Sequence, residues 1–265
     1  MLLNKALTNL KVLVRLQDAS RRWRPQWLPR QYVLRSELAV HPHDTVERGE
    51  QFLSYNVGST EIEVSNWLYA TILLLKPRHI LETGAADGLG TMALASACKA
   101  NGFGLVHSVE IDSAACTRAE QSLKRSGLSD WVQYHCDDSR RFLKGTSIKF
   151  EFGFFDSLCE IRAEECEICM TREILSGPAV FHDTSPYRTL TWTRDDEEAH
   201  AKFRWDLQRI GTRYFDGNFS ETTLSRGLTI LLPRRYPSAE HCGHQATTLS
   251  SGVRDVMEEN VERSL

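Results

Sequence analysis

Hydrophobic and polar positions along this chain fall into short blocks with two different periods. Between residues 60 and 233, apolar runs of strand length alternate with segments whose apolar positions recur every three to four residues, as on one face of a helix. The pattern predicts strands at 79–83, 104–110, 131–135, 150–156, 178–183, 212–219 and 227–233. It predicts helices at 61–76, 89–101, 113–126, 138–144, 160–175 and 193–211. This alternation indicates an α/β fold, a doubly wound and mostly parallel sheet with helices on both faces.

Capping residues predict where two of the helices begin, and the order of the last strands predicts how they pair. Thr60 and Glu63 have the spacing of a capping box, so we expect Thr60 to be the N-cap of the first helix of the block. Thr193 and Asp196 are the expected caps of the last helix, which should stop at Gly211. No helical segment separates the last two strands, which favours an antiparallel pair at the end of the sheet.

Outside this block the pattern changes at both ends of the chain. Residues 2–17 have the spacing of an amphipathic helix, and a basic stretch with two prolines follows at 21–30. Residues after 233 are polar, with a flexible tail expected at 234–250 and a short helix at 251–264. We therefore expect three parts: a helical, basic N-terminal arm and substrate cover (1–59), a main domain (60–233) and a C-terminal tail (234–265).

Composition and charge narrow the class of protein. The formal net charge is −3, which argues against a nucleic-acid partner that would need a broad basic face. Residues 1–36 are locally basic, so the arm is expected to pack on its own domain or on a second subunit of a homodimer, or to contact an anionic surface. No apolar run is long enough for a transmembrane segment.

The seven cysteines are odd in number and scattered, which favours a reducing, cytoplasmic location over a disulfide framework. Cys166 and Cys169 form a lone Cys-x-x-Cys with Cys159 seven residues earlier. A zinc site would need a further ligand that the sequence does not offer, so buried structural thiols are the preferred interpretation.

The most informative motif is the turn after the first strand of the main domain. The apolar run of this strand ends at Glu82, and Gly84, Gly88 and Gly90 follow before an alanine-rich helix. Glycines let the backbone approach a ligand closely, and the helix N-terminus offers its amides to it. Further acids end the next three predicted strands, at Glu110, at Asp137 and Asp138, and at Asp156. Ligands of open α/β sheets bind at this carboxyl edge, which indicates an adenosine-cofactor site.

Over about residues 60–233 the chain resembles the class I S-adenosylmethionine-dependent methyltransferases. It is most similar to the small O-methyltransferases of the catechol type and their bacterial relatives that act on sugars and natural products. The resemblance implies a Rossmann-like, seven-stranded sheet with a reversed last strand, and S-adenosyl-L-methionine as cofactor. It assigns the methionine part of the cofactor to Glu82, Gly84, Ala86 and Gly88, the ribose to Glu110, and the adenine to Asp138 and Ser139.

The expected reaction site lies at the ends of the fourth and fifth strands, at Asp156, His182 and Asp183. The resemblance makes Asp156 and Asp183 candidate ligands of Mg²⁺, which would hold the acceptor oxygens. Thr184 stands where the catechol type has asparagine, and this departs from the metal-dependent pattern. A metal-free reaction with His182 as general base at near-neutral pKa is the alternative, and a third is a local structural role for His182 and Asp183.

The expected activity is O-methylation of a small hydroxylated metabolite or sugar. Acceptor contacts are expected from the segment after the fifth strand, with Tyr187, Arg188 and Trp192, and from His41 or His43 in the N-terminal part. Two other functions use the same motif: an NAD-dependent oxidoreductase of Rossmann type, and a non-catalytic protein that binds the cofactor. The spacing Gly84-x-x-x-Gly88-x-Gly90 departs from the dinucleotide fingerprint, which favours the methyltransferase.

Overall fold

The structure, a computed structural model, describes residues 25–28, 35–39, 50–54, 59–185, 194–222 and 226–233. Several predicted features lie outside these residues: the helix at 2–17, the tail at 234–265, the cap Thr193, and the candidate acceptor contacts His41, His43, Tyr187, Arg188 and Trp192.

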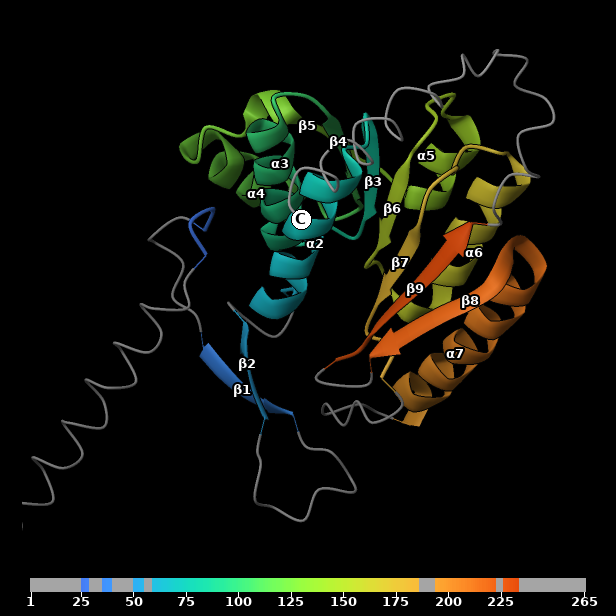
Figure 1. The fold of residues 1–265 in the computed structure, drawn as a ribbon. Helices are drawn as coiled ribbons and strands as arrows, with labels where there is room; N and C mark the ends of the chain where they lie inside the picture. The colour runs from blue at the N-terminus through green and yellow to red at the C-terminus, as the bar shows by residue number, and fades with distance from the viewer. Residues whose placement is uncertain are drawn as a thin grey trace, which may run out of the picture. The chain divides into compact units, whose positions relative to one another are not determined.

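Seven strands form one sheet in the order β5-β4-β3-β6-β7-β9-β8 (Figure 1). Their bounds are β3 His79–Thr83, β4 Leu105–Glu110, β5 Val132–Cys136, β6 Phe152–Phe155, β7 Ala179–His182, β8 Phe215–Thr222 and β9 Leu228–Pro233. Strands β3 to β7 are parallel, and β9 is antiparallel to both β7 and β8. The predicted doubly wound α/β fold with a reversed last strand is thus confirmed.

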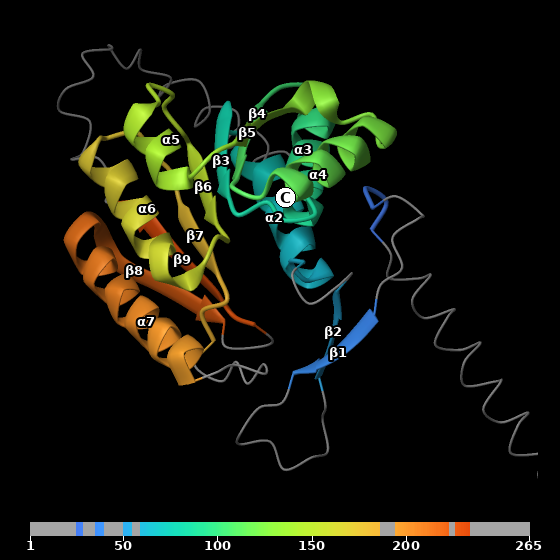
Figure 2. The same ribbon diagram turned by 180° about the vertical axis from the view of Figure 1, so that it is seen from behind.

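Helices cover both faces of this sheet, as Figures 1 and 2 show from opposite sides. On one face lie α2 (Ile62–Leu75), α3 (Leu89–Asn101) and α4 (Ser113–Arg125), and on the other lie α5 (Ser139–Gly145), α6 (Cys159–Thr171) and α7 (Arg194–Tyr214). A short 3₁₀ helix at Ser129–Trp131 leads into β5.

The central strands are buried on both faces, which explains their continuous apolar runs. In β6, Phe152 and Phe154 pack against the helices of the first face, while Phe155 packs against those of the second. Because the two cores hold each strand from both sides, the carboxyl ends of β3, β4, β6 and β7 are fixed relative to one another. These ends carry the predicted site residues.

Several predicted boundaries are wrong, and α6 ends at Thr171 rather than at 175. Thr60 is not the N-cap of α2: Glu61 occupies the cap position without a side-chain cap bond, and the Thr60 hydroxyl instead donates to Asp156. Helix α7 continues past Gly211 to Tyr214, so β8 begins at Phe215 rather than at 212. Gly211 is buried and faces the side chain of Leu231, so tertiary packing continues the helix through a residue that usually ends one.

The N-terminal part contains strands that the helical prediction omitted. Strands β1 (Arg35–Ala39) and β2 (Glu50–Ser54) pair antiparallel as a two-stranded sheet. In this pairing, the backbone N–H and C=O groups of each strand bond to the other strand, whereas those of a helix would bond within the helix.

Three histidines form a chain across neighbouring strands β3, β4 and β5. Nδ1 of His79 lies 3.1 Å from Nε2 of His107, and Nδ1 of His107 lies 3.4 Å from Nε2 of His135. His107 is buried against the edge of the Phe150 ring. Burial, together with the neighbouring His135 and His79, lowers the pKa of His107 to about 4.

The cysteines of the described residues form no disulfide. Cys166 and Cys169 are buried in the core between α6 and the sheet, as expected of structural thiols, and burial raises the pKa of both. None of the described helices is long and apolar enough to span a membrane.

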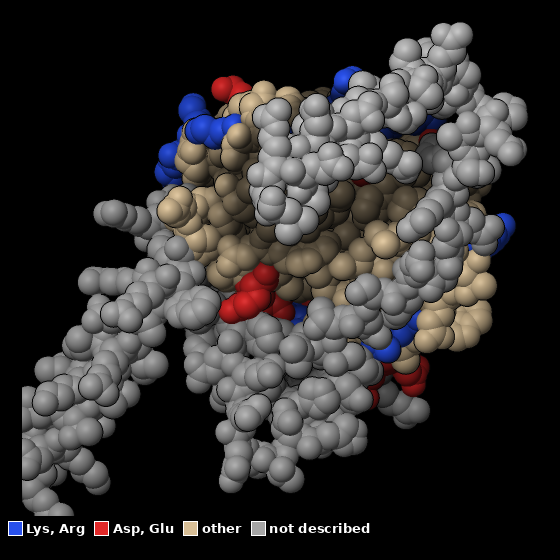
Figure 3. All heavy atoms as spheres, in the orientation of Figure 1, with Lys and Arg blue, Asp and Glu red and all other residues tan. Residues whose placement is uncertain are grey.

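The face of the molecule in Figure 3 has a hollowed, uncharged middle, with charged side chains of both signs toward its margin. The described residues on this face therefore make no continuous basic surface. That nucleic acid is not a partner stays a prediction.

Candidate active site

A cavity of about 370 Å³ opens at the carboxyl edge of β3, β4, β5 and β6. It is lined by Gly84, Ala86, Val109, Glu110, Ile111, Asp137, Asp138, Ser139, Arg140, Asp156, Ser157, Leu158 and Ile161. This is the switch point of the sheet, because the chain runs outward from β3 to β5 and then returns to β6 on the other side. The structure thus gathers six predicted site residues around one cavity: Gly84, Ala86, Glu110, Asp138, Ser139 and Asp156.

The glycine turn approaches the end of β6 so closely that a side chain would not fit. Gly84 has φ +78°, and a Cβ atom there would lie 2.4 Å from the carbonyl oxygen of Asp156. Gly88, at φ +79°, is the N-cap of α3 and does not line the cavity. Glycine is needed at both positions, but only Gly84 borders the space for a ligand.

Glu82 lies beneath the turn and not in the cavity. Its carboxylate is 1% exposed and accepts hydrogen bonds from Thr91 (2.5 Å) and Ser108 (2.6 Å). Burial raises the pKa of Glu82 to about 7, although the two hydroxyls act in the opposite direction. The expectation that Glu82 meets the methionine ammonium group has no support in this geometry, because the side chain points under α3 and holds the turn in place.

Glu110 and Asp138 line the cavity, and both already bind backbone amides. Glu110 accepts from the amides of Ala86 and Asp112, each at 2.9 Å. Asp138 is the N-cap of α5, accepts from the amide of Arg140 at 2.9 Å and pairs with its guanidinium at 3.0 Å. The hydrogen bond from Arg140 is the main reason that the pKa of Asp138 is lowered. Both carboxylates border the cavity and can accept further hydrogen bonds.

Ser139 belongs to a buried network that sequence reasoning missed. Glu165 of α6 is fully buried and accepts hydrogen bonds from the hydroxyls of Thr83 (2.7 Å), Ser157 (2.8 Å) and Ser139. Burial raises the pKa of Glu165, and these hydroxyls oppose the rise. Since Ser139 and Ser157 give their protons to Glu165, the lone pairs of these two hydroxyls remain for a donor in the cavity.

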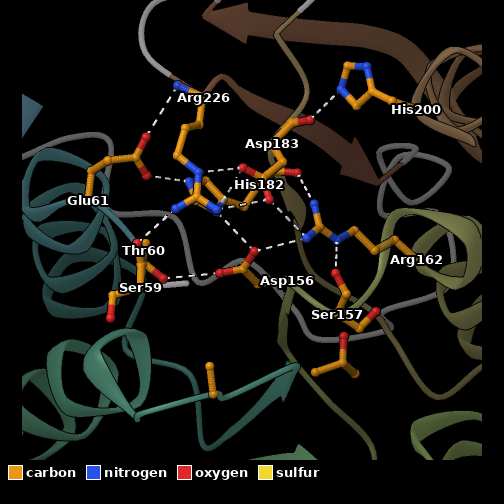
Figure 4. Close-up of polar contacts among 12 residues, drawn as sticks. Ser59, Thr60, Glu61, Asp156, Ser157, Arg162, His182, Asp183, His200 and Arg226 are labelled. Carbon is orange, nitrogen blue, oxygen red and sulfur yellow. Dashed lines mark hydrogen bonds and ion pairs between the residues drawn. The ribbon is translucent and has the colours of Figure 1, made fainter. Parts of the chain in front are cut away.

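Beside the cavity, Asp156 joins a cluster of buried charges (Figure 4). Its Oδ1 lies 2.9 Å from Nδ1 of His182 and 3.2 Å from the Arg162 guanidinium. Its Oδ2 accepts from Thr60 at 3.0 Å. The other ring nitrogen of His182, Nε2, lies 2.5 Å from Glu61 Oε2. Asp156 therefore connects the cavity to groups that are wholly buried.

Asp183 forms the deeper half of this cluster. Its Oδ1 accepts from Nε of Arg226 at 2.7 Å, and its Oδ2 accepts from Arg162 at 3.1 Å and from Arg226 at 3.4 Å. The backbone amide of Arg226 also donates to Glu61 at 3.2 Å. The cluster thus consists of three acids, Glu61, Asp156 and Asp183, and three bases, Arg162, His182 and Arg226.

His182 is not a free base with a near-neutral pKa, so that expectation is corrected. Burial acts to lower its pKa, but the carboxylates of Asp156, Asp183 and Glu61 outweigh burial and raise the pKa to about 10. Both ring nitrogens point at carboxylates, so the imidazolium has no lone pair for a substrate proton. His182 instead holds Asp156 in place.

The same arrangement does not fit the Mg²⁺ that the resemblance suggested. One ligand atom from each of Asp156, His182 and Asp183 lies within 4.8 Å of the others, which by distance alone would suit a metal. Mg²⁺ prefers oxygen ligands, however, and both oxygens of Asp183 are held by arginines. Three cations already balance the three carboxylates.

Glu61, Arg162 and Arg226 were missed because their sequence signals point elsewhere. Glu61 follows a capping-box threonine and reads as an ordinary first-turn acid. Arg162 lies in a helix rich in charged residues, where a surface position is the usual expectation. Arg226 reaches the site because β9 runs antiparallel to β7, so the segment that leads into β9 at Leu228 lies at the carboxyl end of β7.

Comparisons with known proteins agree with the fold. Residues 81–184 match the sequence family described as a methyltransferase domain. No curated protein matches the chain. SAH-bound methyltransferase PaMTH1 of Podospora anserina shares the fold with a TM-score of 0.59 at 16% identity, over 67% of this chain and 80% of its own.

Two further solved structures show the same fold. The SAM complex of O-methyltransferase TomG from Streptomyces achromogenes, involved in tomaymycin synthesis, has a TM-score of 0.53 at 16% identity and covers 66% of this chain and 82% of its own. The SAH complex of an O-methyltransferase from Bacillus cereus has a TM-score of 0.53 at 16% identity, with 68% and 84% covered.

The matched sequence range runs from within β3 to the end of β7 and includes every residue that lines the cavity. The fold around it, with its reversed last strand, is the one that these solved methyltransferases share. Residues 81–184 therefore match a methyltransferase domain in sequence, and the chain shares the fold of solved methyltransferases that bind SAM or SAH.

Proposed function

We propose that the protein transfers the methyl group of S-adenosylmethionine to an oxygen of a small hydroxylated metabolite or sugar. The observation that carries this proposal is the position of Asp156, which lines the cofactor-sized cavity and at the same time belongs to the buried charge cluster. The named O-methyltransferases among the structures of this fold favour oxygen as the acceptor atom.

The cavity offers groups for each part of the cofactor. The turn at Gly84 and Ala86 borders the end where the methionine part would lie, and Glu110 can accept the ribose hydroxyls. Asp138 and Ser139 lie at the other end, and the adenine amino group is a donor that suits the accepting lone pairs of Ser139.

In the proposed reaction, Asp156 orients the acceptor and takes its proton. Its Oδ2 accepts one hydrogen bond among the described residues, from Thr60, and so has a lone pair for the acceptor hydroxyl. The acceptor oxygen attacks the methyl carbon, the bond between carbon and sulfur breaks, and its electron pair stays on sulfur as S-adenosylhomocysteine forms. The hydroxyl proton passes to Asp156, while His182 and Arg162 hold its other oxygen.

Cofactor binding is tested by the change Glu110→Ala. The loss of charge-assisted hydrogen bonds to the ribose should weaken S-adenosylhomocysteine binding by about 1–3 kcal/mol, measured by isothermal titration calorimetry. Glu120→Ala, which removes an exposed acid of α4, is the matched control and should bind like the unaltered protein. Equal affinity in the two variants would remove Glu110 from the cofactor site.

The same titration separates the other functions. Binding of NADH without binding of S-adenosylhomocysteine would support the oxidoreductase in place of the methyltransferase. Cofactor binding without methyl transfer to any member of a broad acceptor panel would support a non-catalytic binding protein.

Catalysis is tested by the change Asp156→Asn. The amide keeps the shape of the side chain but cannot take the acceptor proton, so turnover should fall about 100-fold or more while cofactor affinity stays the same. An unchanged turnover number would exclude Asp156 as the proton acceptor.

We further propose that residues 60–233 are the methyltransferase domain, with 1–59 as substrate cover and 234–265 as tail. A cytoplasmic location and a role of the basic arm in a homodimer or at an anionic surface stay predictions.

A further inference from the structure

We propose that the guanidinium of Arg226 takes the place of a divalent cation at the ends of β6 and β7, so that this chain binds no metal there and holds its acceptor through Asp156 alone. The second part of this proposal rests on the proposed function, in which Asp156 holds the acceptor.

The first support is the state of the two candidate metal ligands. A hard cation needs carboxylate oxygens that can turn toward it. Both oxygens of Asp183 are held by Arg226 and Arg162 at 2.7–3.4 Å, and its side chain is 4% exposed. Oδ1 of Asp156 faces Arg162 and His182. A metal would have to displace an arginine from Asp183, which leaves only Oδ2 of Asp156, where Thr60 donates, as an oxygen without an arginine partner.

The second support is the way Arg226 is anchored. Its Nη1 donates to the carbonyl of Ser59 at 2.9 Å, and its backbone amide donates to Glu61. The next residue, Gly227, has φ +84° and lies so close to Ser185 that a Cβ atom would come within 2.1 Å of the Ser185 amide. Side chain and backbone are both held, so Arg226 has no room to withdraw.

The third support is the balance of charge. Arginines stay protonated in proteins, so Arg162 and Arg226 remain cations wherever they are buried. Together with the His182 imidazolium, they match Glu61, Asp156 and Asp183 one for one. A divalent ion would add two positive charges to a neutral, buried cluster, at a cost that its few remaining ligand oxygens would not offset.

The choice of substrate depends on which carboxylate of the cluster a substrate in the cavity can contact. Among its carboxylates, only that of Asp156 lines the cavity. One carboxylate oxygen can hold one hydroxyl, whereas a metal would chelate two neighbouring oxygens. The preferred acceptors are therefore compounds with a single reactive hydroxyl, and a vicinal diol should have no advantage over them.

The direct test is a titration of the full-length protein with Mn²⁺, followed by the electron paramagnetic resonance signal of the free ion. It needs neither cofactor nor turnover, so its outcome is separate from that of the proposed function. The unaltered protein should bind no Mn²⁺ at this site. Binding that is abolished by Asp183→Asn would overturn the proposal.

A pair of variants tests the role of Arg226. Arg226→Gln removes the positive charge and should create a Mn²⁺ site, whereas Arg226→Lys keeps the charge and should not. Circular dichroism checks that each variant is folded. Absence of Mn²⁺ binding by a folded Arg226→Gln variant would show that Arg226 does not stand in for the metal. If that variant does not fold, the titration of the unaltered protein still decides whether the site takes a metal.

The substrate claim has its own measurement. With a monohydroxy acceptor and its vicinal-diol analogue, kcat/KM should be similar and unchanged by a chelator. A strong preference for the diol that the chelator removes would overturn the inference, although methyl transfer itself would then be established.

Discussion

Asp183 is constrained both in its backbone and in its side chain. Its φ of +60° lies in the left-handed region, which among residues with a side chain asparagine and aspartate tolerate best. Its carboxylate is shared by two buried arginines. Such strain at a site persists only where surrounding contacts enforce it, and here the ion pairs supply them.

Asp183→Asn separates these two constraints. The asparagine can keep the backbone conformation but leaves Arg162 and Arg226 without the charge of their shared partner, so the free energy of unfolding should fall by about 3–5 kcal/mol. Urea denaturation measures this change, and Asp130→Asn, at an exposed acid, is the control. A loss as small as that of the control would mean that the cluster contributes little to stability.

Glu165 should act on the cofactor through the serines that it orients. In Glu165→Gln, the amide nitrogen cannot accept a hydrogen bond, so a hydroxyl among those of Thr83, Ser139 and Ser157 must turn away. We expect binding of S-adenosylhomocysteine to weaken by about 1–2 kcal/mol in calorimetry. The exposed Glu160→Gln on the same helix should bind normally, and equal affinities would contradict a positioning role.

At the scale of elements, the turn between β3 and α3 contacts the end of β6, a strand that is distant in sequence. Gly84 packs on the backbone of Asp156, so the shape of the cofactor turn and the position of the proposed proton acceptor depend on the same contact. A change in this turn should therefore affect both cofactor binding and turnover.

Gly84→Ala tests this dependence, and Gly102→Ala is its matched control. Both glycines have φ near +75°, but a Cβ at Gly102 would meet nothing within 4 Å, while one at Gly84 would collide with the end of β6. The control should lose only about 1 kcal/mol of stability from backbone strain. Thermal unfolding should show a larger loss for Gly84→Ala, together with weaker cofactor binding. Equal losses would show that the close approach is unimportant.

Prediction from sequence succeeded where local pattern decides the outcome and failed where packing decides it. The bounds of β3 and α3 were predicted to the residue, because the apolar run and the glycines determine them. Glu110, Asp138 and Asp156 were placed at one edge by the rule for parallel strands. The partners of Asp156 and Asp183 could not be predicted in this way. Arg226 and Glu61 come from distant segments, and only the assembled sheet shows that they meet.

At the scale of the whole molecule, the chain of His79, His107 and His135 makes the stability of the folded protein depend on pH. Its central imidazole is neutral when folded, because its pKa is about 4, whereas an unfolded histidine has a pKa of 6.5. Above 6.5 neither state takes up a proton and the full stability is present. As pH falls from 6.5 toward 4, the unfolded state binds a proton that the folded state does not, so stability is lost.

This pH dependence can be isolated with His107→Gln, which hydrogen-bonds but does not titrate. Urea denaturation of both proteins should show the unaltered protein losing about 2 kcal/mol relative to the variant between about pH 7 and about pH 5. A difference between the two proteins that is the same at both values would contradict the lowered pKa.

The reversed last strand also has a consequence for how the protein is made. During synthesis, Glu61, Asp156 and Asp183 leave the ribosome well before Arg226, which is followed by the strand that fixes its position. Until β9 is inserted between β7 and β8, the carboxylate of Asp183 lacks Arg226, one of its two guanidinium partners. A ribosome-bound chain that stops before residue 226 should therefore carry the cofactor turn yet remain loosely folded at the acceptor end, and the enzyme should become complete only when its final strand arrives.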